Sequence, residues 1–146
     1  MRIYSKATVY EAAIKRIEWL FDEFPNVVVS VSGGKDSTVV FHLTLEAARR
    51  RNRLPLNVLF VDQEGEWEST IENVREIMYR PDVTPYWLQV PLKLFNAAAH
   101  NEHWLTSWDE DCKEDWVHPQ DPISLKENVY GKSRFSEIFD AAIAYH

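Results

Sequence analysis

The sequence predicts an α/β protein with a parallel β-sheet and flanking helices. An apolar run at residues 27–31 reads as a buried strand, and it is followed by the pair Gly33-Gly34 and then by a helical pattern. A second apolar run, at residues 56–61, comes after that helix. Two strands joined by a helix form a right-handed crossover in which the strands are parallel. The order of elements therefore predicts the fold class.

Composition predicts a compact globular protein with one domain over residues 1–146. The chain is 45% hydrophobic and 13% aromatic, which is enough for one core. Its formal charge of −7 argues against general binding of nucleic acid, and we expect the cluster Arg49–Arg51 to be a solvated helix end. We expect a cytoplasmic protein with no membrane partner, because no segment has the length of a membrane span and the N-terminus lacks a signal-peptide pattern. The single cysteine, Cys112, agrees.

The first half of the chain has clear signals for helices and strands. Thr8 followed by Glu11 has the spacing of a capping box, and apolar residues then recur at helical spacing until Pro25. The first strand is predicted at residues 27–31. The second helix is predicted at residues 36–51, where apolar residues share one face.

The middle of the chain continues the alternation of strands and helices. The second strand covers residues 56–61, and a helix follows at residues 67–79, ended by Pro81. Residues 86–90 lie between two prolines and are predicted to form the third strand. Residues 92–99 are predicted to form a short helix.

The last third of the chain has a different character. Residues 100–132 lack periodicity and are rich in Trp, Asp, Glu and Pro, which predicts a long irregular loop. A loop of this length in a small domain is usually functional or stabilised by a partner. Residues 133–146 regain a helical stripe and are predicted to form a C-terminal helix.

The segment S-V-S-G-G-K-D-S at residues 30–37 has the properties of a phosphate-binding loop. Glycines at the turn allow backbone N–H groups to converge on phosphate oxygens, and the following helix adds its N-terminal dipole. Serine hydroxyls and the charge of Lys35 favour the same ligand. A Walker A loop is excluded, because Asp36 stands where serine or threonine is needed and no glycine lies upstream in the strand.

Three charged residues are candidates for direct roles in this site. Lys35 is the expected charge partner of a phosphate. Asp36 is either a ligand of Mg²⁺ or a cap of the helix. Asp62 follows the second strand at the carboxyl edge, where ligands of parallel sheets bind. It is placed to bind a ribose hydroxyl or a phosphate-bound Mg²⁺, with a helix cap as the alternative.

The irregular segment contains further residues that could take part in chemistry. The spacing of His100, His103, Cys112 and His118 is irregular, so the histidines are interpreted as surface or loop-packing residues, with a zinc site as the alternative. Acidic neighbours should keep the Cys112 thiol protonated. Four tryptophans are interpreted mainly as packing residues, with base stacking as the alternative: Trp87, Trp104, Trp108 and Trp116. The segment and its C-terminal flank also carry three cations, which are either solvated or close over a phosphate or sulfate: Lys126, Lys132 and Arg134.

These motifs together resemble a known family. The loop resembles the PP-loop of N-type ATP pyrophosphatases. With L-F-V-D-Q-E at residues 59–64, Y-R-P-D at 79–82, D-P-I-S at 121–124 and E-N-V-Y-G at 127–131, the chain resembles the N-terminal part of phosphoadenosine phosphosulfate (PAPS) reductase-like proteins, including the immunoglobulin-binding regulator A proteins of enterobacteria.

The resemblance implies a Rossmann-like fold of the adenine nucleotide α-hydrolase type that binds ATP or PAPS. The residues that match its nucleotide site are Ser30, Ser32, Gly33, Gly34, Lys35, Asp36, Ser37 and Asp62. Members of this fold continue into further strands, whereas this chain has room for about three. We therefore expect a sheet that is incomplete at its C-terminal side. The alternatives are a truncated gene, an expressed domain, or a subunit whose site is completed by a partner protein or a second copy.

The expected activity is cleavage of the α–β phosphate bond of ATP, with transfer of AMP and release of pyrophosphate. Lys35 and Asp36 are the expected catalytic residues, and Asp36 and Asp62 the expected ligands of Mg²⁺. One alternative is a non-catalytic regulator that senses a nucleotide or sulfonucleotide and acts with a partner. A sulfonucleotide reductase is less favoured, because the cysteine-containing E-C-G-[IL]-H segment of that family is absent from the sequence.

Overall fold

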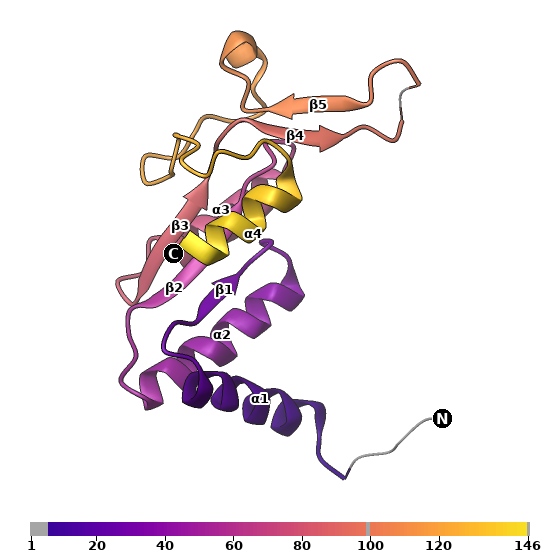
Figure 1. Ribbon diagram of the computed structural model, residues 1–146. Helices are drawn as coiled ribbons and strands as arrows, with labels where there is room; N and C mark the ends of the chain where they lie inside the picture. Colours follow the sequence, from indigo (N-terminus) through magenta and orange to yellow (C-terminus); the bar gives the residue numbers. More distant parts are fainter. Residues whose placement is uncertain (1–5, 99, 146) are drawn as a thin grey trace.

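The computed structural model describes residues 6–98 and 100–145 (Figure 1). The elements are α1 (Val9–Glu23), β1 (Val28–Ser30), α2 (Lys35–Arg50), β2 (Leu56–Val61), α3 (Glu68–Met78), β3 (Val83–Leu88), β4 (Leu92–Phe95), β5 (Trp104–Ser107), the 3₁₀ helix η1 (Glu110–Asp115) and α4 (Phe135–Tyr145). The predicted α/β fold is confirmed.

The main sheet is parallel, with three strands in the order β1-β2-β3. The central strand β2 is almost entirely buried, as expected for a strand with a neighbour on each side and helices on both faces. The third strand begins earlier than predicted and includes Pro85, which pairs in register with Val58. Proline is tolerated there because β3 is an edge strand of this sheet.

Helices cover both faces of the sheet, so the core has two parts. Helices α2 and α3 pack on one face, and α1 packs against α2. Helix α4 covers the other face, where Ile138 and Ala142 contact strand residues such as Leu59 and Leu88 (Figure 1). Within residues 6–98 and 100–145, no helix combines the length and apolar character needed to cross a membrane.

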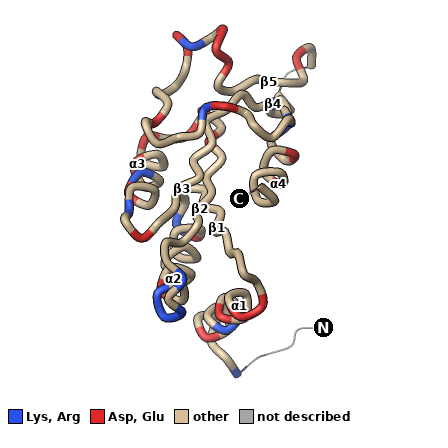
Figure 2. The backbone as a smooth tube through the Cα atoms, turned by 60° about the vertical axis from the view of Figure 1, so that its left-hand side comes forward, with Lys and Arg blue, Asp and Glu red and all other residues tan. Residues whose placement is uncertain are grey.

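The start and end of α1 are both fixed by polar contacts. The predicted capping box is present: the Glu11 amide donates to the Thr8 hydroxyl (3.2 Å), and the Thr8 amide donates to the Glu11 carboxylate (2.8 Å). At the other end, Arg53 donates to the carbonyls of Phe21 (2.8 Å) and Phe24 (3.0 Å). Arg50 and Arg51, at the end of α2, also form ion pairs with Glu18 and Asp22 of α1. These arginines therefore join the C-terminal ends of the two helices, where Figure 2 shows basic residues gathered.

The prediction of a helix at residues 92–99 is wrong for residues 92–98, and residue 99 lies outside the described residues. Leu92–Phe95 forms strand β4, which pairs in antiparallel fashion with β5. Leu92 is buried while its neighbour Lys93 is exposed, so the apolar residues alternate as in a strand. The pairing with β5 outweighs the helical interpretation of this short apolar run.

The segment at residues 100–132 is less irregular than predicted. It contains β5 and η1, and its later part lies against the sheet: the Leu125 amide donates to the Trp87 carbonyl (2.7 Å), and the Gln89 amide donates to the Leu125 carbonyl (3.0 Å). The predicted C-terminal helix is present as α4.

Acid should weaken the fold through Asp82. Hydrogen bonds from Arg80, and then from Arg49, lower the Asp82 pKa from 3.8 to about 2. A carboxyl with a lowered pKa stabilises the fold above its unfolded value and loses that contribution as the pH falls through its folded value. Asp82→Asn should therefore destabilise the protein by roughly 2 kcal/mol at pH 6, and the difference should shrink between about pH 4 and pH 2. Urea unfolding of both proteins across this range checks it, and a constant difference would contradict it.

Candidate functional site

The predicted phosphate loop lies at the carboxyl end of β1 and has a defined shape. Ser37 organises it: the hydroxyl accepts a hydrogen bond from the Ser32 amide (3.1 Å) and donates to the Gly34 carbonyl (3.0 Å). Gly33 has φ +72°, in the left-handed region that glycine adopts without strain. The glycine and serine positions therefore have structural reasons in addition to the predicted contacts with a ligand.

Helix α3 holds the loop from the side, through residues that the sequence analysis did not identify. The Asn73 amide group donates to the Gly33 carbonyl (2.7 Å) and to the Thr38 hydroxyl (3.0 Å). A Cβ on Gly33 would lie 2.5 Å from Cγ2 of Thr70 and 3.1 Å from its carbonyl oxygen. The loop is thus fixed between α2 and α3. The sequence around Asn73 contains no motif from which this contact could be predicted.

Lys35 and Asp36 begin α2 and are both open to solvent. The Lys35 ammonium lies 2.9 Å from the Asp36 carboxylate, and their side chains are 89% and 91% exposed. Gly34 is the N-cap residue and no side chain caps this helix, so the alternative role of Asp36 as a cap is not observed. Both charged groups are available to a ligand at the loop.

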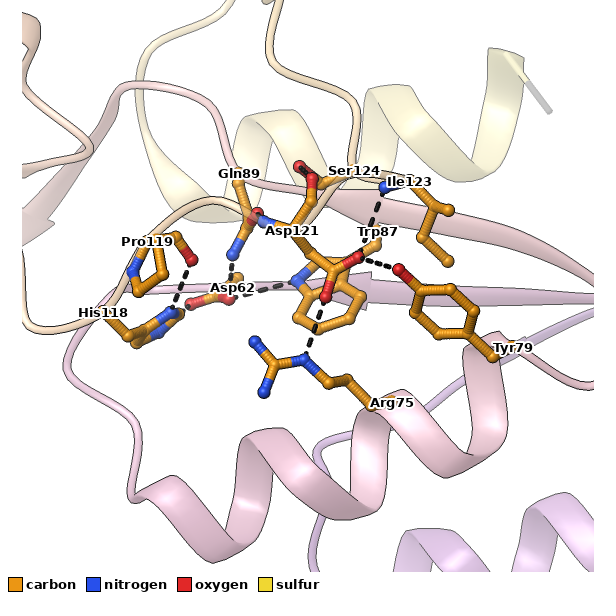
Figure 3. Close-up of polar contacts among 10 residues, drawn as sticks. All are labelled: Asp62, Arg75, Tyr79, Trp87, Gln89, His118, Pro119, Asp121, Ile123 and Ser124. Atoms are coloured by element: carbon orange, nitrogen blue, oxygen red, sulfur yellow. Dashed lines mark hydrogen bonds and ion pairs between the residues drawn. The ribbon is translucent and has the colours of Figure 1, made fainter.

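Asp62 has a different setting from the open carboxylate that was expected. Its side chain is fully buried, and one oxygen accepts hydrogen bonds from Nε1 of Trp87 (3.0 Å) and Nε2 of Gln89 (2.8 Å). The other oxygen accepts from the Glu64 amide (2.8 Å). Direct binding of ribose or Mg²⁺ would require exchange of these donors. In this structure Asp62 instead supports the sheet edge, because it links the end of β2 to Trp87 of β3 and to Gln89 (Figure 3).

A second buried carboxylate, Asp121, extends this network to α3 (Figure 3). Its oxygens accept hydrogen bonds from Arg75 (2.9 Å) and from the Tyr79 hydroxyl (2.8 Å), and its amide donates to the Gln89 side chain (2.6 Å). The hydrogen bond to Asp121 is the main cause that raises the Tyr79 pKa. Gln89 therefore connects the two acids and ties the segment around Asp121 to the sheet.

Two residues near Asp62 have left-handed backbone conformations that are uncommon for side chains of their size. They are Glu64 (φ +71°) and Trp108 (φ +54°). The Trp108 amide donates to the Glu64 carboxylate (2.7 Å), and the Trp108 indole donates to the Asp62 carbonyl (2.8 Å). Such conformations persist where surrounding contacts hold them, and they are found preferentially at functional sites.

A cavity of about 430 Å³ lies beside this network, and it is lined by Glu66, Glu68, Ile71, Arg75, Val117, His118 and Pro119. Burial, and next the charge of Asp62, raise the pKa of Glu66. Nε2 of His118 is buried, has no hydrogen-bond partner among the described residues, and lies 3.6 Å from the Asp62 carboxylate. The zinc alternative gains no support, because no three His, Cys, Asp or Glu side chains in the described part of the chain can hold a metal ion.

The remaining candidates mostly have packing roles. Trp87 and Trp108 are fully buried, and the Arg134 guanidinium lies 5.1 Å from the centre of the Trp104 ring. Burial and the charges of neighbouring acids raise the pKa of the Cys112 thiol, which agrees with the expected protonated state. Lys126 lines a cavity of about 490 Å³ that shares Val117, His118 and Pro119 with the cavity beside Asp62.

Comparisons with known proteins place these elements in a family. The phosphoadenosine phosphosulfate reductase domain matches residues 26–117, which include the loop and Asp62. The uncharacterized protein YbdN of Escherichia coli (strain K12) is 36% identical over 121 residues, covering 80% of this chain and 29% of YbdN. The chain thus spans less than a third of that relative, and no solved structure gives a significant match. From the domain match across most of the chain, we conclude that the protein belongs to the PAPS reductase domain family.

Proposed function

We propose that the chain binds an adenine nucleotide through residues 30–37 and that it cleaves the α–β phosphate bond of ATP. The observation that carries this proposal is the exposed Lys35 ammonium beside a glycine turn that Asn73 holds in place. Backbone N–H groups at such a turn and an exposed ammonium, here paired with the equally exposed Asp36, would stabilise the charge that develops on a leaving pyrophosphate. An acceptor oxygen would attack the α-phosphorus while the bond to the bridging oxygen breaks.

The chain's residues fit a Mg²⁺ ion that arrives with the nucleotide. Mg²⁺ is usually held by one or two carboxylates together with phosphate oxygens and water. Asp36 is an exposed carboxylate at the loop and fits this role, whereas Asp62 is buried and already bonded to neutral donors. When bound, the ion would neutralise charge on the phosphates. The chain's own part is to position the phosphates through the loop and Lys35.

A second function, a nucleotide-responsive regulator that acts with a partner, is favoured by the openness of the site. The loop follows β1, an edge strand that pairs only with β2 in the described residues. Phosphoryl transfer benefits from a site closed to water. A partner protein or a second copy of the chain that covers this edge would complete the site in either function, as a sensor or as an enzyme.

Replacing Lys35 by alanine should weaken ATP binding by about 10- to 100-fold, because a charge-assisted contact contributes roughly 1.5–3 kcal/mol. Calorimetric titration with ATP and Mg²⁺ measures the change. Lys15→Ala is the matched control, since Lys15 is an exposed lysine on α1 outside the loop. The 89% exposure of Lys35 predicts an unchanged thermal transition for the variant.

Incubation with ATP labelled at the α and γ positions distinguishes the two functions. Formation of AMP and pyrophosphate that is lost in Lys35→Ala supports the enzyme. Saturable binding without these products supports the regulator. If neither ATP nor PAPS binds to the wild-type chain, both proposals are wrong.

A further inference from the structure

Trp67 is unusual among the tryptophans because its ring is largely in water. It is 82% exposed, compared with 53% for Trp19 and 41% for Trp104, and Trp87 and Trp108 are fully buried. Its neighbours in the chain, Glu66 and Glu68, are acidic, so it is not part of a continuous apolar run. A large aromatic surface in this setting is available for contact with a planar ligand.

The backbone of Trp67 is held by the first hydrogen bonds of α3, the helix that packs against the phosphate loop. Trp67 is the N-cap residue of α3, and its carbonyl accepts hydrogen bonds from the amides of Thr70 (2.9 Å) and Ile71 (3.1 Å). Thr70 in turn lies against Gly33: a Cβ built on Gly33 would lie only 2.5 Å from Cγ2 of Thr70. Three residues, about 4.5 Å along the helix axis, therefore separate the Trp67 backbone from the residue that contacts the loop.

The charges of the loop and of the residues beside Trp67 have opposite sign, so they would orient a bound nucleotide. Lys35 lies in the loop, while Glu66 and Glu68 flank Trp67 and line the neighbouring cavity. Phosphates are attracted to Lys35 and repelled by the two glutamates. The neutral and aromatic end of a nucleotide is then the part that suits the surface at Trp67.

We propose that Trp67 is a stacking platform for the purine base of the nucleotide whose phosphates bind the loop. This inference rests on the proposed nucleotide-binding function and adds the residue that recognises the base. Both contacts lie at the same edge of the sheet, since the loop follows β1 and Trp67 follows β2, a parallel neighbour. Stacking on an aromatic ring accepts any base, so Trp67 supplies affinity for a nucleoside and leaves the choice of base to other groups.

The test compares ATP with inorganic tripolyphosphate, which has the phosphates without the base. In the presence of Mg²⁺, Trp67→Ala should weaken ATP binding by about 5- to 100-fold and leave tripolyphosphate binding within about twofold. Trp67→Phe should keep ATP affinity within about threefold, because a phenyl ring also stacks. ATP should quench tryptophan emission in the wild type and less so in Trp67→Phe. Trp19→Phe, at an exposed tryptophan on α1, is the control and should keep the full quench.

Each other result has a distinct meaning. Equal weakening of both ligands by Trp67→Ala would overturn the proposal, because the residue would then support the loop. Unchanged ATP affinity in Trp67→Ala would overturn it as well. If the wild type binds tripolyphosphate as tightly as ATP, the base makes no contribution and stacking is refuted while the phosphate loop stands. Failure of the wild type to bind either ligand would refute the nucleotide-binding function itself.

Discussion

Replacing Gly33 by alanine should destabilise the protein by about 2–4 kcal/mol and abolish tight nucleotide binding. Two effects add. A left-handed conformation costs an L-residue roughly 1–2 kcal/mol, and Gly33 has φ +72°. The new Cβ would also lie 2.5 Å from Cγ2 of Thr70 and 3.1 Å from its carbonyl oxygen. Rotation of the threonine removes the first contact, but the carbonyl belongs to α3, so the loop or the helix must move.

Two other glycines separate these effects. Gly131 has φ +64° with no atom within 4 Å of a built Cβ, so Gly131→Ala should show only the conformational cost. At Gly34, φ is −81° and the nearest atom, Oγ of Ser32, is 3.6 Å from the Cβ. Gly34→Ala should therefore change stability by less than about 1 kcal/mol. Urea unfolding of the three variants gives the comparison, and equal values for Gly33→Ala and Gly131→Ala would show that packing against α3 is unimportant.

The sequence predicted the conformation of the candidate loop, which depends on local signals. A strand, a glycine turn and a helix start are adjacent in the chain, so residues 30–37 could be recognised without knowledge of distant contacts. The same holds for the capping box at Thr8, where both partners lie within one helical turn. These features formed where they were expected.

Contacts between distant segments could not be predicted in this way. The amide of Asn73 reaches the loop across the packing of α2 and α3, and its position in α3 shows no motif. Residues 92–95 are a short apolar run compatible with helix or strand, and only pairing with β5 decides between them. The sequence placed Asp62 at the correct edge of the sheet, but its exposure depends on Trp87 and Gln89 of the neighbouring strand.

Asp62→Asn should lower the free energy of unfolding by about 2–4 kcal/mol, because the amide cannot accept from all three donors. If its oxygen faces Trp87 and Gln89, its NH₂ group meets the Glu64 amide. If it is turned round, the NH₂ group meets the other two donors. At least one buried donor then loses its partner in either orientation. For a domain of this size, the thermal transition should fall by roughly 5–15 °C.

Asp62→Asn also distinguishes the two possible roles of Asp62, support of the sheet edge and direct binding of the ligand. If Asp62 supports the sheet edge, Asp62→Asn lowers the transition temperature, while the affinity for ATP with Mg²⁺, measured well below that transition, stays within about threefold, because no direct contact with the ligand is lost. If Asp62 binds ribose or Mg²⁺ directly, affinity falls at all temperatures. Asp36→Asn should behave in the opposite way: its side chain is 91% exposed, so stability stays constant while Mg²⁺-dependent binding weakens. Burial of Asp62 and the donors around it favour the supporting role, and the proposed function then assigns direct contact with phosphates and metal to the exposed residues of the loop.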